Sequence, residues 1–368
     1  MRIAQFGVKG IPSKGGAERV VEALVRCLSG QHSFTVYCNK RYVSPEAQVA
    51  GVSLVRIPTV PGKYLQPVCL FIGSAFHALF RGHYDLIHVH NAEACFIVPF
   101  LRLRYRVVAT SHGLAYAVDK WGQLDKGLIR LLEYFFIWFP NVMTSVSLPV
   151  AEYYRKKYQR NIRYVPNGVD TDATVNMEAA ETKLKSNGVK SHYILFVAGR
   201  LDPIKGCHLL LQAYEHIKTE RQLVVVGGMS TLPKYGQALR KFASAMVRFV
   251  PFIESRAELF GIVRGACLFV FPSTVEAMSM MLLEVASLGV PILCSDIPAN
   301  TAILPTQAKY FRSGEVNDLA EKLHWSLEHP EAMAELGRQA KVWVKEKFSW
   351  EVIAEEYNQV YQTTVEQT

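Results

Sequence analysis

FPSTVEAMSMMLLEVASLGVPILC, residues 271–294, places two acids around the predicted start of a helix. An apolar run that ends at Phe271 predicts a buried strand, and Glu276 lies in the polar loop that follows it. Ser279 lies near the expected start of the helix, and Glu284 lies one turn inside it. The first turn of a helix offers unpaired N–H groups and the positive end of its dipole to an anion. From this stretch alone, a phosphate site flanked by two carboxylates and an ordinary α/β unit with solvated acids are equally good interpretations.

The composition predicts a folded, two-domain protein of a reducing compartment. The chain has 368 residues, half of them hydrophobic and a fifth charged, which is too long for one ordinary core and unlike a disordered chain. Its seven cysteines are scattered and form no C-x-x-C pair, so they indicate neither a zinc site nor a disulfide framework. Met1 leads directly into a predicted strand, and no apolar run is long enough to cross a bilayer. We therefore expect a cytoplasmic protein, attached peripherally to the inner face of the membrane if attached at all.

The net charge of +9 lies entirely in the first half of the chain. Residues 1–170 contain 21 Lys and Arg against 10 Asp and Glu, whereas residues 171–368 contain 20 against 22. Such an asymmetry predicts an anionic partner for the first half, which can be a membrane surface, a phosphorylated acceptor or nucleic acid. A solvated basic face without any partner remains the alternative.

Short apolar runs alternate with helical patterns along the whole chain, and residues 92–103 are one of the predicted helices. This alternation predicts parallel sheets covered by helices. The turn PNGVD at residues 166–170 interrupts this pattern, and we place a polar linker at residues 171–190. The predicted fold is therefore α/β, with two doubly wound, Rossmann-like domains that face each other across a cleft. Residues 1–170 form the first domain, residues 171–348 form the second, and residues 349–368 form a closing helix that packs back on the first.

Two features of the first domain lie where parallel sheets bind ligands, beyond the carboxyl ends of strands. Gly15 and Gly16 precede a predicted helix, where they would let the backbone approach a negatively charged group. Their spacing does not match the dinucleotide fingerprint G-x-G-x-x-G, which disfavours a nicotinamide-dependent oxidoreductase. His112 follows a predicted strand and precedes Gly113, so its imidazole either contacts a sugar or phosphate at the sheet edge or bonds to the backbone.

Other features of the first domain have both a structural and a functional interpretation. His88 and His90 follow one predicted strand, and we expect their side chains on opposite faces of the extended chain, which argues against a metal site. Aromatic residues at 121–138, an apolar run at 64–80 and a basic cluster at 155–163 predict either ordinary helix packing or a membrane-facing surface.

The second domain carries cations and glycines at further predicted strand ends. Arg200 and Lys205 follow its first strand, and a planar guanidinium beside a mobile ammonium suits a pyrophosphate. Gly199 and Gly228 lie at the ends of two predicted strands. Because glycine has no side chain, a ligand can approach the backbone closely there. Together with the two acids of residues 271–294, these groups make a ligand site the better interpretation.

The sequences GRLDPIKG, residues 199–206, and PSTVEAMSMMLLEVASLGVP, residues 272–291, resemble the retaining glycosyltransferases of family 4. The E-x7-E pattern from Glu276 to Glu284 is the most specific motif of that family. A glycine-rich first loop, the PNGVD turn and a closing FSW-x-x-I-A-x-x-Y helix extend the resemblance over essentially the whole chain. The HGL…KWG segment, between residues 112 and 122, also resembles rhamnosyltransferases that build bacterial surface polysaccharides. This resemblance implies the GT-B fold.

The resemblance also implies that the second domain binds a nucleotide-diphosphate sugar and that the first binds the acceptor. Arg200 and Lys205 would bind the donor diphosphate and stabilise its growing charge as it leaves. Glu276 would contact the transferred sugar, and Glu284 the ribose. The backbone amides of Met278 and Ser279 and the Gly15–Gly16 loop would contact the phosphates. His112 would hydrogen-bond the sugar near the reacting carbon. Gly199 would also contact the donor, and Gly228 and Phe252 would lie near the base.

Members of this family need neither a metal nor a cofactor, and the resemblance implies none for this chain. The acceptor hydroxyl attacks the face from which the diphosphate leaves, with that phosphate as the base, so Glu276 is not named a nucleophile. Ala277 stands where family members often have a glycine after the first motif acid. Its Cβ atom changes how closely the backbone approaches the donor, so the resemblance does not identify the donor sugar. We expect a glycan or lipid-linked acceptor at an anionic membrane surface, in lipopolysaccharide or other surface polysaccharide synthesis, and no nucleic acid partner.

Two other functions stay open for a chain of this kind. A nucleotide-sugar epimerase of the same fold would isomerise its substrate without any acceptor. A non-catalytic basic module would bind nucleic acid with an affinity that falls steeply with salt. The donor base, the acceptor, the linkage and the oligomeric state do not follow from the sequence.

Overall fold

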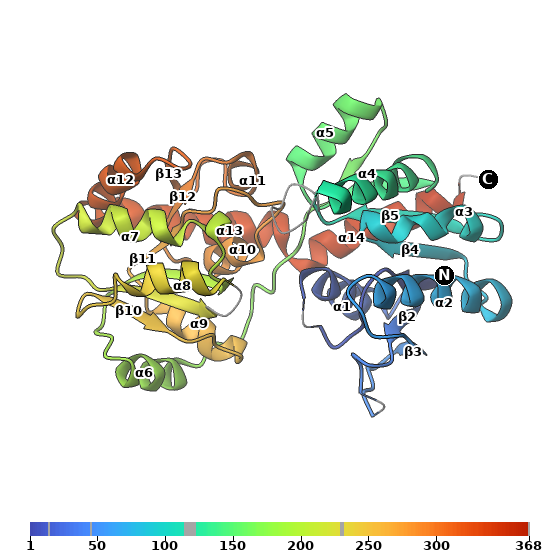
Figure 1. Ribbon diagram of the computed structural model, residues 1–368, viewed down its shortest axis with the longest axis horizontal. Helices are drawn as coiled ribbons and strands as arrows, with labels where there is room; N and C mark the ends of the chain where they lie inside the picture. The colour runs from blue at the N-terminus through green and yellow to red at the C-terminus, as the bar shows by residue number, and fades with distance from the viewer. Residues whose placement is uncertain (14, 45, 114–122, 229–231, 367–368) are drawn as a thin grey trace. The chain divides into compact units, whose positions relative to one another are not determined.

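The computed structural model describes residues 1–13, 15–44, 46–113, 123–228 and 232–366 of the chain. They form two compact units, each with its own sheet (Figure 1). Unit 1 comprises Met1–Gly168 and Trp350–Thr368, and unit 2 comprises Val169–Ser349. The predicted α/β fold with two parallel sheets is confirmed.

Unit 1 is built on a seven-stranded sheet with the strand order β3-β2-β1-β4-β5-β6-β7, and every neighbouring pair of strands is parallel. Its strands are β1 (Arg2–Phe6), β2 (Ser33–Asn39), β3 (Val52–Ile57), β4 (Leu86–His90), β5 (Arg106–Ser111), β6 (Val142–Ser145) and β7 (Arg163–Tyr164). Its helices are α1 (Gly16–Leu28), α2 (Leu65–Arg81), η1 (Ala92–Ile97), α3 (Val98–Leu101), α4 (Gln123–Trp138), α5 (Leu148–Tyr158) and α14 (Trp350–Glu366).

Unit 2 contains a six-stranded parallel sheet with the order β10-β9-β8-β11-β12-β13. Its strands are β8 (Ile194–Arg200), β9 (Leu223–Gly228), β10 (Val247–Val250), β11 (Leu268–Phe271), β12 (Ile292–Ser295) and β13 (Lys309–Phe311). Its helices are α6 (Met177–Ser186), η3 (Pro203–Lys205), α7 (Cys207–Glu215), α8 (Pro233–Arg240), α9 (Arg256–Arg264), α10 (Met280–Ser287), α11 (Pro298–Ile303), α12 (Val316–Glu328) and α13 (Pro330–Phe348).

The two faces of the unit 1 sheet differ in chemistry because side chains alternate along each strand. On one face, apolar residues such as Phe6 and Val89 pack with buried residues of α2, α3, α4 and α5. The other face carries a polar layer, and α14 lies against it (Figure 1). The members of this polar layer, none of which has exposed surface, are Gln5, His88, His90, Thr110 and Thr144 of the strands and Tyr357 and Tyr361 of α14.

The structure corrects our expectation that His88 and His90 lie on opposite faces. Side chains alternate with a period of two, so residues two apart in a strand share a face. The two imidazole centroids are 4.0 Å apart, and both rings belong to the polar layer. Among the residues that the structure describes, no group of three or more His, Cys, Asp and Glu side chains is arranged to hold a metal ion.

Two predicted segments differ from the structure. Residues 92–103, expected as one helix, begin as the 3-10 helix η1 and continue only as the short α3, whose second residue is Pro99. The polar segment 171–190, expected as a linker, contains α6, which Asn176 caps by accepting from Ala179 N at 3.0 Å. Helix α6 packs on α9 inside unit 2. Of the described helices, none is long and apolar enough to cross a bilayer.

In unit 2, the loop after β8 and the loop after β11 are held together by their backbones. Thr274 donates to the Ile204 carbonyl twice, from its backbone N–H at 2.8 Å and from its hydroxyl at 3.3 Å. Gly206 has a φ of +70°, and a Cβ atom there would lie 2.0 Å from the Pro272 carbonyl oxygen. Glycine is required on both counts, because a side chain would be strained by the backbone and would collide with the neighbouring loop.

Replacing Gly206 by alanine should therefore destabilise the protein by more than about 1 kcal/mol, because the added methyl group pushes the two loops apart. Gly314→Ala is the matched control. Gly314 also has a positive φ, +85°, but an added Cβ atom would meet nothing within 4 Å. Urea unfolding of both variants measures the difference. Equal losses of stability would show that the close approach of the two loops does not constrain the fold.

The buried histidines of unit 1 predict a loss of stability in mild acid. Burial lowers the pKa of His88 to about 3 and that of His112, just after β5, to about 4; the pKa of His90 is also well below 6.5. An unfolded histidine has a pKa of about 6.5, so below that pH the unfolded chain binds protons that the folded chain does not.

Each such histidine should reduce the free energy of unfolding by about 1.4 kcal/mol per pH unit as the pH falls from about 6.5 towards its folded pKa. Thermal unfolding between pH 7 and about 4.5 checks this expectation. His88→Gln, which keeps hydrogen-bonding groups without a titration in this range, should flatten the slope. An unchanged slope in that variant would contradict the assignment.

Candidate functional site

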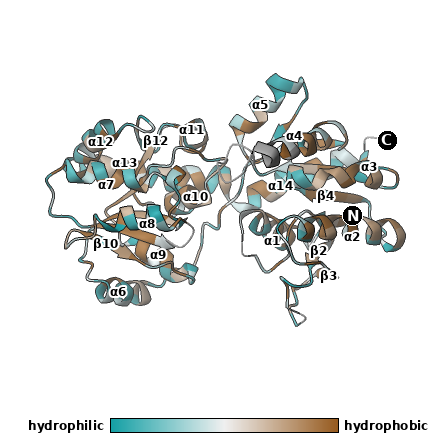
Figure 2. Cartoon of the chain, viewed as in Figure 1, coloured by the Kyte–Doolittle hydropathy of each residue, from teal (hydrophilic) through white to brown (hydrophobic). Residues whose placement is uncertain are grey.

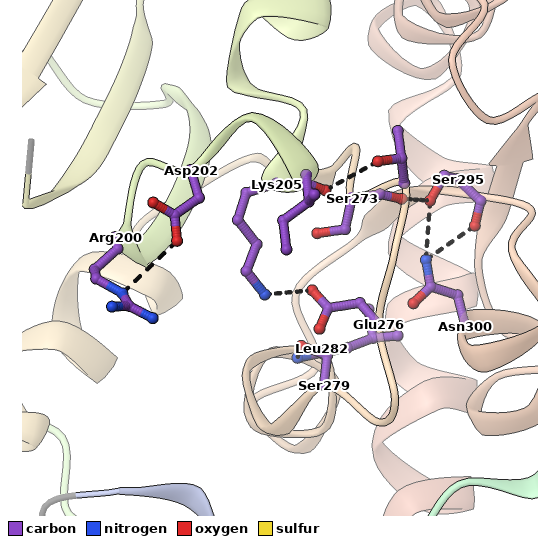
Figure 3. Close-up of polar contacts among 11 residues, drawn as sticks. Arg200, Asp202, Lys205, Ser273, Glu276, Ser279, Leu282, Ser295 and Asn300 are labelled. Carbon is purple, nitrogen blue, oxygen red and sulfur yellow. Dashed lines mark hydrogen bonds and ion pairs between the residues drawn. The ribbon is translucent and has the colours of Figure 1, made fainter. Parts of the chain in front are cut away.

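Lys205 and Glu276 form the central ion pair of unit 2. Lys205 ends the η3 turn after β8, Glu276 lies in the loop after β11, and the Lys205 Nζ and Glu276 Oε1 atoms are 2.6 Å apart (Figure 3). The side chains are 30% and 10% exposed, so the pair is partly shielded from water. An ammonium group has three donors, and this contact uses one of them. Lys205 can therefore bind an anion while it still neutralises the acid.

Arg200 lies at the end of β8, on the same loop as Lys205. Its Nε atom is 3.7 Å from Asp202 Oδ2, and its side chain is 61% exposed (Figure 3). Such an exposed pair holds its partners weakly. The guanidinium therefore keeps most of its five donors in water, where they can bind a phosphate oxygen. Sequence reasoning missed Asp202, although it stands two residues after Arg200.

Helix α10 begins where the sequence predicts. Ser279 is its N-cap, and the Ser279 Oγ atom accepts a hydrogen bond from Leu282 N at 3.3 Å. Capping satisfies one of the unpaired N–H groups of the first turn and leaves others for an anion. The preceding residue, Met278, is buried. The structure therefore places the N-terminus of α10 directly after the loop that carries Glu276.

Glu284 lies inside α10 and is bound by an arginine that sequence reasoning missed. Arg256, the first residue of α9, donates from Nη2 to Glu284 Oε1 at 2.6 Å. The Glu284 side chain is only 3% exposed, whereas that of Arg256 is 42% exposed. Because a buried carboxylate needs such a partner, Arg256 fixes where the acid points. The two residues are 28 positions apart, so no local sequence pattern predicts this ion pair.

Hydrogen bonds among Ser273, Ser295 and Asn300, all of them buried, support the loop that carries Glu276. The Ser295 hydroxyl, at the end of β12, donates to the Ser273 carbonyl. Asn300 Nδ2 in turn donates to the carbonyl oxygen of Ser295 at 3.0 Å and to its Oγ atom at 3.1 Å (Figure 3). The three residues tie the carboxyl ends of β11 and β12 together, and none of them was predicted.

Gly199, Gly228 and Phe252 lie close together at the carboxyl ends of neighbouring strands. A Cβ atom on Gly228 would lie 3.3 Å from the Gly199 carbonyl oxygen, and one on Gly199 would lie 4.0 Å from the Phe252 ring. Phe252 is 53% exposed, although it is a large apolar side chain. An exposed aromatic ring beside two glycines offers a flat surface on which a planar ring can stack.

In unit 1, the structure gives a local reason for only one of the two predicted glycines. Gly15 is the N-cap of α1, and a Cβ atom there would lie 2.3 Å from Glu18 Oε2. The other oxygen of this buried carboxylate accepts from Lys9 N at 3.2 Å, so Glu18 ties the loop before α1 to the helix. Gly16 has no such constraint, since an added Cβ atom would meet nothing within 4 Å.

His112 follows β5 and is bound to a second histidine. Its Nε2 atom is 3.1 Å from His90 Nδ1, and the two rings stack with centroids 5.3 Å apart. Burial lowers the pKa of His112 to about 4, so the ring is neutral at physiological pH. The HGL…KWG segment, on which the resemblance to rhamnosyltransferases rests, lies mostly outside the described residues because these omit 114–122.

Taken together, unit 2 presents two cations, one shielded acid, a helix N-terminus and an exposed aromatic ring on strand ends of one sheet. This set suits a diphosphate that is joined to a planar ring on one side and to hydroxyl groups on the other. Ligands of parallel sheets bind at this edge.

Comparisons with known proteins show that both halves of the chain are similar to glycosyltransferases. A model described as Glycosyltransferase Family 4 matches residues 14–173, and one described as Glycosyl transferases group 1 matches residues 179–343. A GDP-mannose-dependent phosphatidylinositol monomannoside mannosyltransferase of Corynebacterium glutamicum is 24% identical over 61% of this chain and 62% of its own length. A D-inositol 3-phosphate glycosyltransferase of Xylanimonas cellulosilytica is 29% identical over 84% of this chain and 82% of its own.

A solved structure gives the same result for the fold. Anabaena HepE, in complex with UDP and glucose, aligns over 99% of this chain and 100% of its own with a TM-score of 0.78 and 16% identity. The two family models together cover most of the chain, the first matching most of unit 1 and the second most of unit 2. The chain therefore belongs to the family 4 glycosyltransferases and has the GT-B fold.

Proposed function

We propose that this glycosyltransferase is a retaining enzyme that moves a sugar from a nucleotide-diphosphate sugar to a hydroxyl group of a glycan or lipid-linked acceptor. The single observation that carries this proposal is the Lys205–Glu276 pair on two loops that touch through their backbones. It sets a cation for the departing diphosphate beside an acid for sugar hydroxyls. The complex of Anabaena HepE with UDP and glucose supports a donor of this class.

In this proposal, the diphosphate lies between Arg200, Lys205 and the first turn of α10. The two cations stabilise negative charge that grows on the phosphate oxygen as the bond to the sugar breaks. The backbone N–H groups of Met278 and Ser279 complete the anion site. Because Lys205 also neutralises Glu276, the acid can stand near the phosphates without repelling them.

Glu276 accepts hydrogen bonds from hydroxyls of the transferred sugar, and Glu284, held by Arg256, accepts from the ribose. Phe252 supports the base beside Gly199 and Gly228. Gly15 and Gly16 contribute backbone contacts to the phosphates, and His112 hydrogen-bonds the donor sugar near the reacting carbon.

The proposed reaction retains the configuration of the sugar and uses neither a metal nor a cofactor. The bond between the anomeric carbon and the phosphate oxygen breaks, and the acceptor oxygen bonds to the same face of that carbon. The acceptor proton passes to the phosphate oxygen that leaves. No protein side chain bonds covalently to the sugar in this scheme.

We expect Lys205→Ala and Glu276→Ala to lower sugar transfer by about 10²–10³-fold while the chain stays folded, because each removes a group that faces developing charge or the sugar. Lys185→Ala is the control, since Lys185 forms an exposed pair with Glu181 elsewhere in unit 2. A thermal-shift screen with UDP, GDP, dTDP and ADP selects the donor, and release of the nucleoside diphosphate measures turnover.

Near wild-type turnover in either variant would remove the site assignment. Turnover of the nucleotide sugar to an isomer in the absence of acceptor would instead identify an epimerase.

The membrane part of the proposal rests on the outer face of α2 in unit 1. Every third or fourth residue of this helix is a large apolar side chain that is 41–70% exposed, and these residues form the apolar stripe Leu65, Val68, Ile72, Phe76 and Phe80. Figure 2 shows α2 mainly in the colour of hydrophobic residues. Soluble monomers rarely expose a contiguous stripe of this kind.

Cations stand at both ends of the apolar stripe. Lys63 precedes α2, Arg81 ends it, and Arg104 Nη1 donates to the carbonyl of Leu79 in its last turn. The helix itself contains no Asp or Glu. Helix α3 packs against both α2 and α4 and adds the exposed Phe100. An apolar stripe between basic ends suits the interface of an anionic bilayer, which supports a lipid-linked acceptor in surface polysaccharide or glycoconjugate synthesis.

Replacing Phe76 and Phe80 by serine should weaken binding to vesicles that contain phosphatidylglycerol by more than about tenfold, because each buried ring contributes about 2 kcal/mol. Arg155→Ser with Lys156→Ser should weaken it less and in a salt-dependent way. Co-sedimentation measures both, with Val342→Ser in unit 2, also an exposed apolar residue, as the control.

Donor hydrolysis in solution should not change in these variants. If the serine variants instead convert a wild-type dimer into a monomer, the apolar stripe is a protein interface and the membrane assignment is wrong.

A further inference from the structure

A line of hydrogen bonds joins α14 to His112 through the polar layer of unit 1. Gln5 Nε2 donates to Tyr361 Oη at 3.4 Å, and Gln5 Oε1 lies 2.8 Å from His90 Nε2. His90 Nδ1 lies 3.1 Å from His112 Nε2. The line thus begins on the closing helix and ends on the histidine at the carboxyl edge of β5.

The chemistry of these groups assigns the protons along the line. An amide oxygen only accepts, so His90 donates from Nε2, and a neutral imidazole that carries its proton there has a bare Nδ1. That bare nitrogen accepts, so His112 must donate from Nε2. His112 then has its own lone pair on Nδ1. The orientation of one glutamine amide therefore determines which nitrogen of His112 is protonated.

A second branch of the polar layer agrees with this orientation of Gln5. Because the Tyr361 hydroxyl accepts from Gln5, it can donate to His88 Nδ1, which lies 2.8 Å away. His88 then donates from Nε2 to Thr110 Oγ1 at 2.6 Å, and Thr110 donates to Thr144 Oγ1 at 2.6 Å. Every contact in both branches has one donor and one acceptor. Apart from His112, which is partly buried, the residues of both branches have no exposed surface, so water does not compete with their hydrogen bonds.

We propose that Gln5, His90 and Tyr361 are positioning residues that hold His112 in the tautomer with a proton on Nε2 and a lone pair on Nδ1. This inference rests on the proposed contact between His112 and the donor sugar. A sugar that loses its diphosphate gathers positive charge around the anomeric carbon. A lone pair of a neutral ring stabilises that charge, whereas an N–H group in its place would oppose it.

The alternative is that the polar layer only docks α14 on the sheet. In that case Tyr361→Phe and Tyr357→Phe should act alike, because both tyrosines lie on the same face of α14 in the polar layer. The proposal separates them. The Tyr361 hydroxyl contacts Gln5 and His88, whereas the Tyr357 hydroxyl interacts with Thr110, at 3.5 Å, and with Thr144.

Ring nitrogen shifts of ¹⁵N-histidine-labelled protein at pH 7 test the proposal, with His112→Gln used to assign the signals. The wild type and Tyr357→Phe should show His112 with a protonated Nε2 and a bare Nδ1. Gln5→Met and Tyr361→Phe should shift His112 towards the other tautomer. A wild-type His112 that is protonated on Nδ1, or a tautomer that Gln5→Met leaves unchanged, would overturn the proposal.

Kinetics with the donor selected by the nucleotide screen gives the second readout. Gln5→Met and Tyr361→Phe should lower kcat about five- to tenfold, the value of one hydrogen bond, with the donor KM changed by less than about twofold. A tautomer change without a loss of kcat would overturn the link to catalysis. A wild-type chain that transfers no sugar refutes the proposed function, while the ring shifts still decide which residues control the His112 tautomer.

Discussion

The contact between the loop after β8 and the loop after β11 is the constraint on which the unit 2 site depends. About one fifth of the chain separates these loops, yet Gly206 lets the first pass against the Pro272 carbonyl, and Thr274 bonds back to Ile204. The cation and the acid of the site are thereby set side by side before any ligand binds. Binding then loses little conformational entropy, and this is what electrostatic preorganisation requires.

The polar layer of unit 1 differs from the site of unit 2, because it buries neutral polar groups rather than an ion pair. Gln5, His88 and His90 have no exposed surface, and hydrogen bonds between side chains replace the water that they lose. A network of this kind tolerates few arrangements, since each proton assignment forces the next. The buried network thus fixes the orientation of its last member, His112, which lies at the edge of the sheet.

Much of the fold and part of the site could be predicted from the sequence because they depend on local patterns. The apolar runs mark the strands, and Ser279 marks the start of α10. The Arg256–Glu284 pair could not be predicted, because its partners meet only after α9 and α10 have packed together. The polar layer was missed for a similar reason, since Gln5 meets Tyr361 across almost the whole chain. The wrong placement of the paired histidines was an error in the period of a strand, not a lack of information.

Helix α14 gives unit 1 an unusual order of synthesis. The strands of this unit are made first, but the helix that covers the polar layer leaves the ribosome only after all of unit 2. Until then, the buried histidines and Gln5 face water or a chaperone, and the half-made unit lacks one of its two covering layers. Unit 1 therefore reaches its final form after translation has passed residue 349, whereas unit 2, which is continuous in sequence, can fold earlier.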